Sequence, residues 1–185
     1  MPNGDSKIST DHTAAGHTGY SAGLARRGKG TMNIDLNDHL SLNRILFSIS
    51  SNKEQTIDEL IETSRADGKV DDVQGFKDAL LKRDAIMSTG IGYGVAIPHV
   101  KMEGIDDFFI TIGIHKRGVD WDSLDDKPTH LIFLIAGPVN QQERYLRVLA
   151  KLTIVIKRPD IRKLLIACHT KYDVLETMLK THGHT

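Results

Sequence analysis

The spacing of apolar and polar residues divides the chain into two parts. Residues 1–32 are rich in Gly, Ser, Thr and His and show no regular apolar period. Such a segment cannot bury enough apolar surface to offset the entropy lost on ordering. We therefore predict a flexible N-terminal tail over residues 1–32 and one folded domain over residues 33–182. The basic cluster Arg26-Arg27-Gly28-Lys29 leaves open that the tail is a nucleic-acid or membrane arm, or that it reflects the choice of start site.

Two amphipathic helices are predicted in the first half of the domain. Ser51 and Glu54 have the spacing of a capping box at the start of the first helix, which Asp67-Gly68-Lys69 ends. The second helix is predicted to begin at Asp71-Asp72 and to end near Lys82-Arg83-Asp84. The apolar positions at helical spacing are Ile57, Leu60 and Ile61 in the first helix and Val73, Phe76 and Leu80 in the second.

Four apolar stretches favour strands. Residues 45–49 alternate loosely between apolar and polar positions, residues 95–97 form a short apolar run, and residues 108–114 form a longer one. Residues 130–136 are apolar throughout after the initial histidine, which predicts a strand buried on both faces of a sheet. The polar segment over residues 119–128 is expected to form turns and a loop.

Three helices are predicted after the last strand. Asn140 is expected to cap the first, with Glu143 at the capping-box position, and Pro159 opens the second. Thr170 with Asp173 caps the third. The apolar stripes are Leu146, Leu149, Leu152 and Ile156, then Ile161, Leu164 and Leu165, then Val174, Leu175 and Met178. Because helices and strands intermingle along the chain, we predict an α/β fold with a small central mixed β-sheet flanked by helices.

Composition and charge narrow the function classes. The 185 residues include 24 Lys and Arg and 24 Asp and Glu, so the formal net charge is zero, which argues against a dedicated nucleic-acid binder. No apolar run approaches the roughly 18 residues that span a bilayer, and the N-terminus lacks a signal-peptide pattern. The single cysteine, Cys168, cannot form an internal disulfide. We expect a cytoplasmic protein that is not embedded in a membrane.

The stretch Ser88–His99 has the most unusual pattern in the chain. Gly90, Gly92 and Gly94 alternate with larger residues, and the apolar run that follows ends at Pro98-His99. The glycines resemble part of a dinucleotide-binding fingerprint, but that fingerprint opens a helix, whereas these lead into extended sequence. We interpret the segment as a flexible loop or tight turn, a short buried strand, and an imidazole at the end of that strand.

The sequence gives little support for a metal site, a cysteine nucleophile or a serine hydrolase. The nine histidines include no helical pair or Cys/His cluster, so no metal site is predicted. Cys168 lies in an apolar segment and is interpreted as a core residue. Ser88 lacks the context of a nucleophile elbow, which disfavours a hydrolase. No cofactor is expected.

His99 is the candidate nucleophile. A neutral imidazole has one ring nitrogen free to attack near neutral pH, and a phosphohistidine divides one phosphoryl transfer into two steps. Backbone N–H groups of the three glycines, with the hydroxyls of Ser88 and Thr89, could bind phosphoryl oxygens. Arg83 is the nearest upstream cation that could stabilise developing charge. From these residues alone, an ordinary histidine at a strand end explains the pattern equally well.

Two segments, Ala79-Leu80-Leu81-Lys82-Arg83-Asp84-Ala85 and Ser88–His99, resemble the signature of the fructose/mannitol-type enzyme IIA domains. These belong to the bacterial phosphoenolpyruvate-dependent sugar phosphotransferase system, and the group includes the nitrogen-regulatory enzyme IIA proteins. The resemblance runs from about Ile34 to the C-terminus. It implies a central mixed sheet flanked by helices.

The resemblance also implies roles for individual residues. His99 would accept a phosphoryl group from the histidine phosphocarrier protein and pass it to an enzyme IIB domain. Arg83 falls at the position of the family's active-site arginine, with Asp84 in place of the usual Glu. Transporting members often carry a second active-site histidine where this chain has Tyr145. That tyrosine is either a packed core residue or a hydroxyl donor to a phosphoryl oxygen, so we expect phosphorylation of His99 with altered exchange kinetics.

Two functions remain open on this basis. The first is a phosphoryl carrier for sugar transport. The second is a nitrogen-regulatory enzyme IIA, whose phosphorylation state controls binding to regulatory proteins; the absence of an attached IIB or IIC segment and of the second histidine fits this branch. A receiver domain of a transcriptional regulator ranks lower, because no helix-turn-helix is visible.

Overall fold

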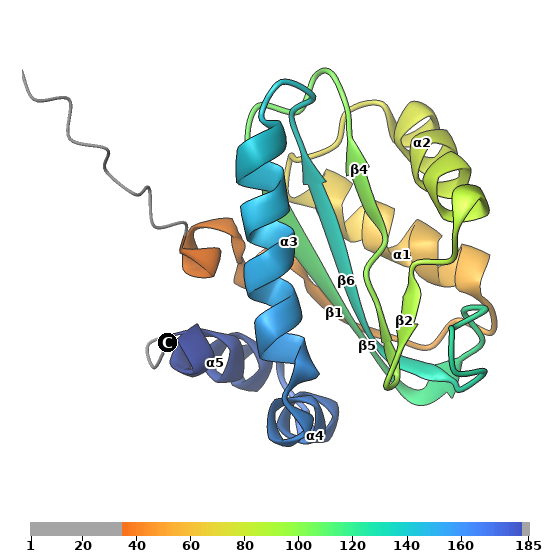
Figure 1. Cartoon of the computed structure of the whole chain (residues 1–185), viewed down its shortest axis with the longest axis vertical. Coiled ribbons are helices and arrows are strands. Elements are labelled where there is room, and N and C mark those ends of the chain that lie inside the picture. Colours follow the sequence, from red (N-terminus) through yellow and green to blue (C-terminus); the bar gives the residue numbers. More distant parts are fainter. Residues whose placement is uncertain (1–34, 183–185) are drawn as a thin grey trace, which may run out of the picture. The chain divides into compact units, whose positions relative to one another are not determined.

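The computed structural model describes residues 35–182, so the tail predicted over residues 1–32 lies outside the described residues. A six-stranded mixed sheet forms the centre of the fold, as predicted (Figure 1). The central strand β6 is antiparallel to β5 and parallel to β3 and β4, and the strand order is β1-β5-β6-β3-β2. The strands are β1 (Ile45–Ser48), β2 (Gly90–Gly92), β3 (Val95–Ala96), β4 (His99–Lys101), β5 (Phe109–Val119) and β6 (Thr129–Gly137).

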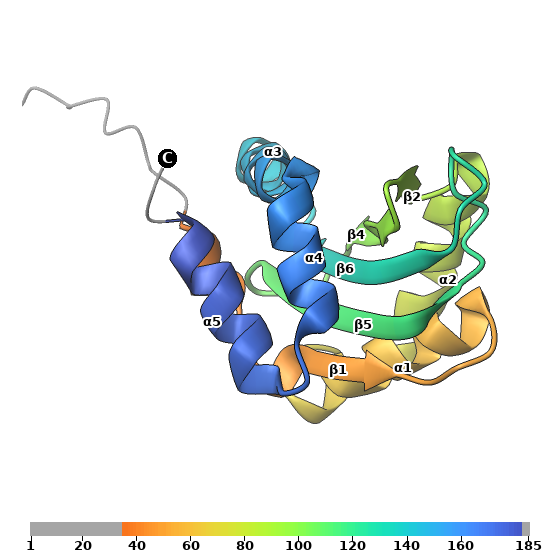
Figure 2. The ribbon, with the colours of Figure 1, turned by 90° about the horizontal axis from the view of Figure 1, so that it is seen from below.

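Helices cover both faces of this sheet (Figure 2). The helices α1 (Lys53–Ala66) and α2 (Val73–Ile86) pack on one face. The other face is covered by α3 (Gln142–Lys157), α4 (Pro159–Ala167) and α5 (Lys171–His182). Two short 3-10 turns, η1 (Leu36–His39) and η2 (Leu42–Arg44), precede β1.

Strand β6 supplies both cores, because successive side chains of a strand point to opposite faces. Leu131, Phe133 and Ile135 pack toward α3, α4 and α5, whereas Ile132, Leu134 and Ala136 pack toward α1 and α2. All six side chains are fully buried. The uninterrupted apolar run of the sequence therefore reflects burial on both sides, as predicted.

The helix starts agree with the sequence only in part. In α5, Thr170 and Asp173 exchange the two bonds of a capping box, as predicted. In α1 the cap is Asn52, whose side chain accepts from the Gln55 N–H at 2.9 Å, so the predicted Ser51–Glu54 box is wrong by one residue. Serine and asparagine cap helices about equally well, and sequence alone does not choose between neighbours.

Helix α3 departs furthest from the prediction. Asn140 does not cap it; Gln141 occupies the N-cap position and makes no capping bond with its side chain. The predicted stripe is also rotated, since Leu146 is 54% exposed. The buried face instead contains Tyr145, Val148, Leu152, Val155 and Ile156. Apolar residues on two adjoining faces of α3 allow either phase, and packing against the sheet selects one.

The glycine segment is a β-hairpin and not the flexible loop that the sequence suggested. Strands β2 and β3 pair in antiparallel fashion around the turn Tyr93-Gly94. Both turn residues have positive φ, 60° and 73°, as a two-residue type I′ hairpin requires. Gly90 packs so closely against Ser123 that an added Cβ would lie 2.5 Å from its hydroxyl oxygen. The tight-turn interpretation is thus confirmed, and the glycines serve the turn and close packing.

Candidate active site

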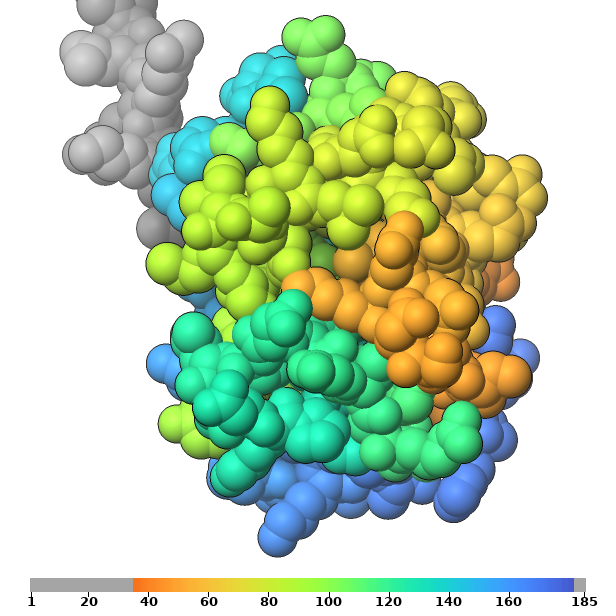
Figure 3. Space-filling model, turned by 90° about the vertical axis from the view of Figure 1, so that its right-hand side faces the viewer, coloured from red at the N-terminus to blue at the C-terminus, as the bar shows by residue number. Residues whose placement is uncertain are grey.

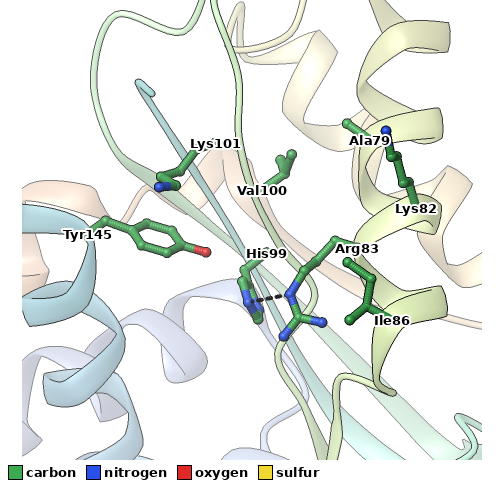
Figure 4. Close-up of a pocket in the computed structure, with 8 residues that line it drawn as sticks. All are labelled: Ala79, Lys82, Arg83, Ile86, His99, Val100, Lys101 and Tyr145. Carbon is green, nitrogen blue, oxygen red and sulfur yellow. Dashed lines mark hydrogen bonds between the residues drawn. The ribbon is translucent and has the colours of Figure 1, made fainter. Parts of the chain in front are cut away.

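A cleft of about 390 Å³ lies between the last turns of α2, strand β4 and the first turn of α3 (Figure 4). His99 lies at its centre, with Arg83 on one side and Tyr145 on the other. Three of the side chains that line the cleft are cations, and none is a carboxylate. The lining residues are Ala79, Lys82, Arg83, Ile86, His99, Val100, Lys101 and Tyr145.

The chain around Pro98 fixes both the position and the tautomer of His99. Pro98 separates β3 from β4, so His99 begins a strand and does not end one, contrary to the expectation. Its Nδ1 lies 2.7 Å from the carbonyl oxygen of Ile97. Because a carbonyl only accepts, Nδ1 must carry the proton, and the lone pair is left on Nε2. The nitrogen that can attack is therefore Nε2.

Arg83 faces this nitrogen from the last turn of α2, a helix that extends beyond its predicted end to Ile86. The Arg83 Nε–H donates to His99 Nε2 at 3.1 Å, and Nη1 donates to the Met87 carbonyl at 3.1 Å. The structure thus brings together the two residues that the sequence analysis had assigned to catalysis.

Burial lowers the pKa of His99, and the positive charge of Arg83 acts in the same direction. The bond to the Ile97 carbonyl and the charge of Asp84 oppose this shift without reversing it. The imidazole is therefore neutral at neutral pH, which is the form that a nucleophile requires.

Tyr145 lies in the first turn of α3, buried in the core, with its ring 6.0 Å from that of His99. Its hydroxyl is directed toward His99 (Figure 4). This hydroxyl makes no hydrogen bond to another residue of the range 35–182. Burial raises the pKa of Tyr145 to about 12, so the hydroxyl stays protonated. The side chain is a packed core residue, as one interpretation predicted, and its protonated hydroxyl faces the cleft. Donation from this hydroxyl to a phosphoryl oxygen stays a prediction.

The other predicted ligands lie elsewhere. The Ser88 hydroxyl donates to the Trp121 carbonyl at 2.9 Å. The Thr89 hydroxyl donates to Asp84 at 2.6 Å and accepts from the Trp121 indole at 3.0 Å. Ser88, Thr89, Gly90, Gly92 and Gly94 do not line the cleft, so the geometry gives no support to their expected role in binding a phosphoryl group.

Sequence reasoning missed Lys101 and Lys82. Lys101 stands two residues after His99, and residues two apart on a strand share one face. That spacing was a usable signal, but β4 was not predicted as a strand. Lys82 precedes Arg83 on α2 and lies at the exposed rim of the cleft.

Two kinds of feature are absent from the described residues 35–182. No group of three or more His, Cys, Asp or Glu side chains in this range is placed to hold a metal ion. None of the helices in the same range combines the length and the apolar character that a membrane crossing needs.

Comparison with known proteins gives this geometry a family. Residues 38–181 match the family "Phosphoenolpyruvate-dependent sugar phosphotransferase system, EIIA 2". The chain is 38% identical over 127 residues to the fructose-specific EIIABC component of Bacillus subtilis, which covers 69% of this chain but only 20% of that protein. It is 32% identical over 126 residues to the fructose-specific EIIA component of Haloferax volcanii, covering 68% of this chain and 82% of that one.

A solved structure agrees with the sequence matches. The nitrogen regulatory protein IIA-Ntr from Neisseria meningitidis superposes with a TM-score of 0.72 at 27% identity, over 77% of this chain and 98% of that one. The family match spans the sheet, the helices and the His99 cleft. The chain therefore belongs to the EIIA 2 family of the phosphoenolpyruvate-dependent sugar phosphotransferase system, the group of phosphoryl carriers that includes the nitrogen-regulatory IIA branch.

Proposed function

We propose that Nε2 of His99 accepts a phosphoryl group from a phosphohistidine on the histidine phosphocarrier protein and passes it to an enzyme IIB. The observation that carries this proposal is the fixed tautomer: the Ile97 carbonyl holds the proton on Nδ1, and Nε2 faces the cleft beside Arg83. The Bacillus relative is named as an EIIABC component, which supports an enzyme IIB as the acceptor. A carrier in this relay would work in the cytoplasm.

In the proposed step the Nε2 lone pair attacks phosphorus and a new P–N bond forms. The P–N bond to the donor breaks, and its electron pair returns to the donor imidazole. The proton on His99 Nδ1 stays in place, so the phosphorylated ring is cationic and the Ile97 carbonyl stabilises it. A cationic ring is a good leaving group, which suits onward transfer to the next acceptor.

Arg83 has two successive partners in this scheme. Before transfer its Nε–H donates to His99 Nε2. As phosphorus approaches, the guanidinium turns its donors to the phosphoryl oxygens, where a bond to a charged acceptor is stronger than one to a neutral nitrogen. The Tyr145 hydroxyl faces the same oxygens from the opposite wall and donates without carrying charge.

The rim of the cleft suits a protein donor more than a free small molecule. Ile86 and Met87, at the end of α2, expose 79% and 64% of their surface beside Arg83. Two neighbouring apolar side chains at the site entrance would become buried beneath a docked protein, whereas a free small molecule would leave them in water. The donor would then bring its phosphohistidine into the cleft while its surface covers these two residues.

The nitrogen-regulatory branch is the second candidate, and the Neisseria IIA-Ntr structure favours it. In that branch His99 is still phosphorylated, but the output is binding to regulatory partners that depends on the phosphorylation state. Tyr145 in place of a second imidazole also fits a protein whose signal is the phosphorylated fraction of His99, since such a protein does not depend on fast phosphoryl transfer.

The test is a reconstituted relay of phosphoenolpyruvate, enzyme I, the phosphocarrier protein and this chain. We expect acid-labile phosphate on the wild type and none on His99→Ala. His169→Ala is the matched control, because His169 is exposed in the turn between α4 and α5. An unlabelled wild type, or equal labelling of His99→Ala, contradicts the proposal. Transfer onward to enzyme IIB supports the transport reading, and failure of that step alone supports the regulatory one.

A further inference from the structure

Lys101 occupies a position in the cleft that the carrier scheme leaves unused. It lies on the same face of β4 as His99, and the side chain of Val100 between them packs into the core on the α1 and α2 side. Figure 4 shows its side chain beside Tyr145, on the wall opposite Arg83. A cation from each wall thus borders the imidazole.

The partners of Lys101 are both neutral. Its ammonium donates to the side-chain oxygen of Gln142, the first residue of α3, and lies 5.5 Å from the centre of the Tyr145 ring. Among the described residues, no carboxylate pairs with it. Lys53 and Lys77, by contrast, each bind two carboxylates. The charge of Lys101 is therefore uncompensated beside a site where a dianion is proposed to form.

We propose that Lys101 is a second phosphoryl-binding cation, which exchanges Gln142 for a phosphoryl oxygen when His99 becomes phosphorylated. The inference rests on the proposed function and extends it. The ammonium carries charge in both bonds, but only the phosphoryl oxygen adds an opposite charge at the acceptor, so the dianion outcompetes the neutral Gln142 amide. The four-carbon lysine stem can swing between the two positions.

Three donors would then surround the phosphoryl group. Arg83 approaches from α2, the Tyr145 hydroxyl from α3, and Lys101 from the strand that also holds His99. A neutral tyrosine at the α3 position adds a donor but no charge, and Lys101 supplies a second positive charge at that wall. With Lys82 at the rim, these are the charged and titratable groups that line the cleft around His99.

The experiment phosphorylates His99 with phosphoramidate, a small donor, and titrates the product by phosphorus NMR. In that reaction the P–N bond of phosphoramidate breaks, the bond to Nε2 forms, and ammonia leaves. A nearby cation lowers the pKa of the second phosphoryl proton, so we expect Lys101→Met to raise it by about one unit. Lys101→Met should also lower the occupancy of His99 at equilibrium with the phosphocarrier protein by roughly tenfold.

Three further variants separate binding from a structural role. Gln142→Ala removes the resting partner and keeps the cation, so its phosphoryl pKa should match the wild type. Lys101→Arg should retain most of the effect, and Lys163→Met, on the exposed side of α4, controls for the loss of one charge. Thermal unfolding checks that each variant is folded.

The outcomes distinguish failure of the proposed Lys101 role from failure of the proposed carrier function. Equal phosphoryl pKa values in the wild type and Lys101→Met, or an equal rise in Gln142→Ala, overturn the role of Lys101 and leave the carrier function standing. A wild type that neither phosphoramidate nor the protein donor labels on His99 overturns the carrier function, and the role of Lys101 with it.

Discussion

Two polar clusters lie side by side in this domain, and adjacent residues of α2 serve one each. Arg83 points into the His99 cleft, whereas Asp84 points into a cluster with Lys53, Thr89 and Trp121. Figure 3 shows the face where α1, the end of α2 and the loop between β5 and β6 meet, the three segments that supply Lys53, Asp84 and Trp121.

The clusters differ in how far their polar groups are satisfied. Asp84 binds Lys53 and accepts from both the backbone N–H and the hydroxyl of Thr89. Burial works against the carboxylate, but these bonds prevail and lower the pKa of Asp84. In the cleft, the Tyr145 hydroxyl has no hydrogen-bond partner among the described residues, and the Lys101 ammonium has only neutral partners. Polar groups whose hydrogen bonds are all made within the protein stabilise the fold. Polar groups that lack a partner, or a partner of opposite charge, can bind a ligand.

The largest expected effect is on the rate of His99 phosphorylation, and it distinguishes the His99 cleft from the Asp84 cluster. Arg83→Met should slow phosphorylation of His99 by about 10²- to 10³-fold, because it removes the donor that stabilises the transferring group. Its stability should change by less than about 1 kcal/mol, since the side chain is partly exposed. Labelling rates and urea unfolding measure the two quantities. A large loss of stability would place Arg83 with the structural cluster.

Asp84→Asn should give the reverse result. It leaves Lys53 without its buried partner, which is expected to destabilise the domain by about 2–3 kcal/mol. The stability that Asp84 contributes is present above its ordinary pKa of 3.8 and is lost as pH falls through the lowered value. Urea unfolding at neutral pH measures the effect. An Asp84→Asn variant of wild-type stability would contradict the structural assignment.

Tyr145 should give a smaller effect, on rate alone. Tyr145→Phe keeps the packed ring and removes the donor, so we expect donor and acceptor rates to fall by up to about tenfold. Tyr145→His restores the imidazole that many transporting relatives carry and should change both rates. Stopped-flow or quenched labelling gives the comparison. Rates identical to wild type in both variants would assign Tyr145 to the core only.

The smallest effect concerns pH. The lowered pKa of His99 keeps the proposed nucleophile neutral at pH values somewhat below the ordinary 6.5. The labelling rate should therefore begin to fall with acid only below pH 6.5. Arg83→Met removes one cause of the shift and should move the His99 titration, followed by NMR of the ring, upward. A limb at or above 6.5 in the wild type would contradict this account of the site.

The same shift affects stability. The unfolded chain binds a proton at His99 more readily than the folded protein does. The contribution of His99 to the free energy of unfolding is therefore fully present above pH 6.5, and it is lost as pH falls toward the lowered pKa of the folded state. Burial also lowers the pKa of His39, which adds the same sign. The difference between the wild type and His99→Ala isolates the first contribution.

Much of the fold could be predicted because its signals are local. The apolar run of β6, the stripes of α1 and α2 and the cap of α5 each depend on residues close in sequence. The phase of α3, the hairpin at Gly90–Gly94 and strand β4 could not, because distant partners decide them. The candidate site followed the same division: Arg83 and His99 were found from a motif, and Lys101 was not.

The sequence by itself pointed to the candidate nucleophile His99, to Arg83 and to the α/β fold, since a long ordered motif and apolar periodicity carry that information along the chain. Only the tertiary structure decided which polar side chains of the motif already have hydrogen-bond partners within the protein. Ser88 and Thr89 read as ligands in sequence, yet the Trp121 backbone and ring and the Asp84 carboxylate engage both hydroxyls. Whether a polar group is free to act depends on what packs against it, and those partners come from elsewhere in the chain.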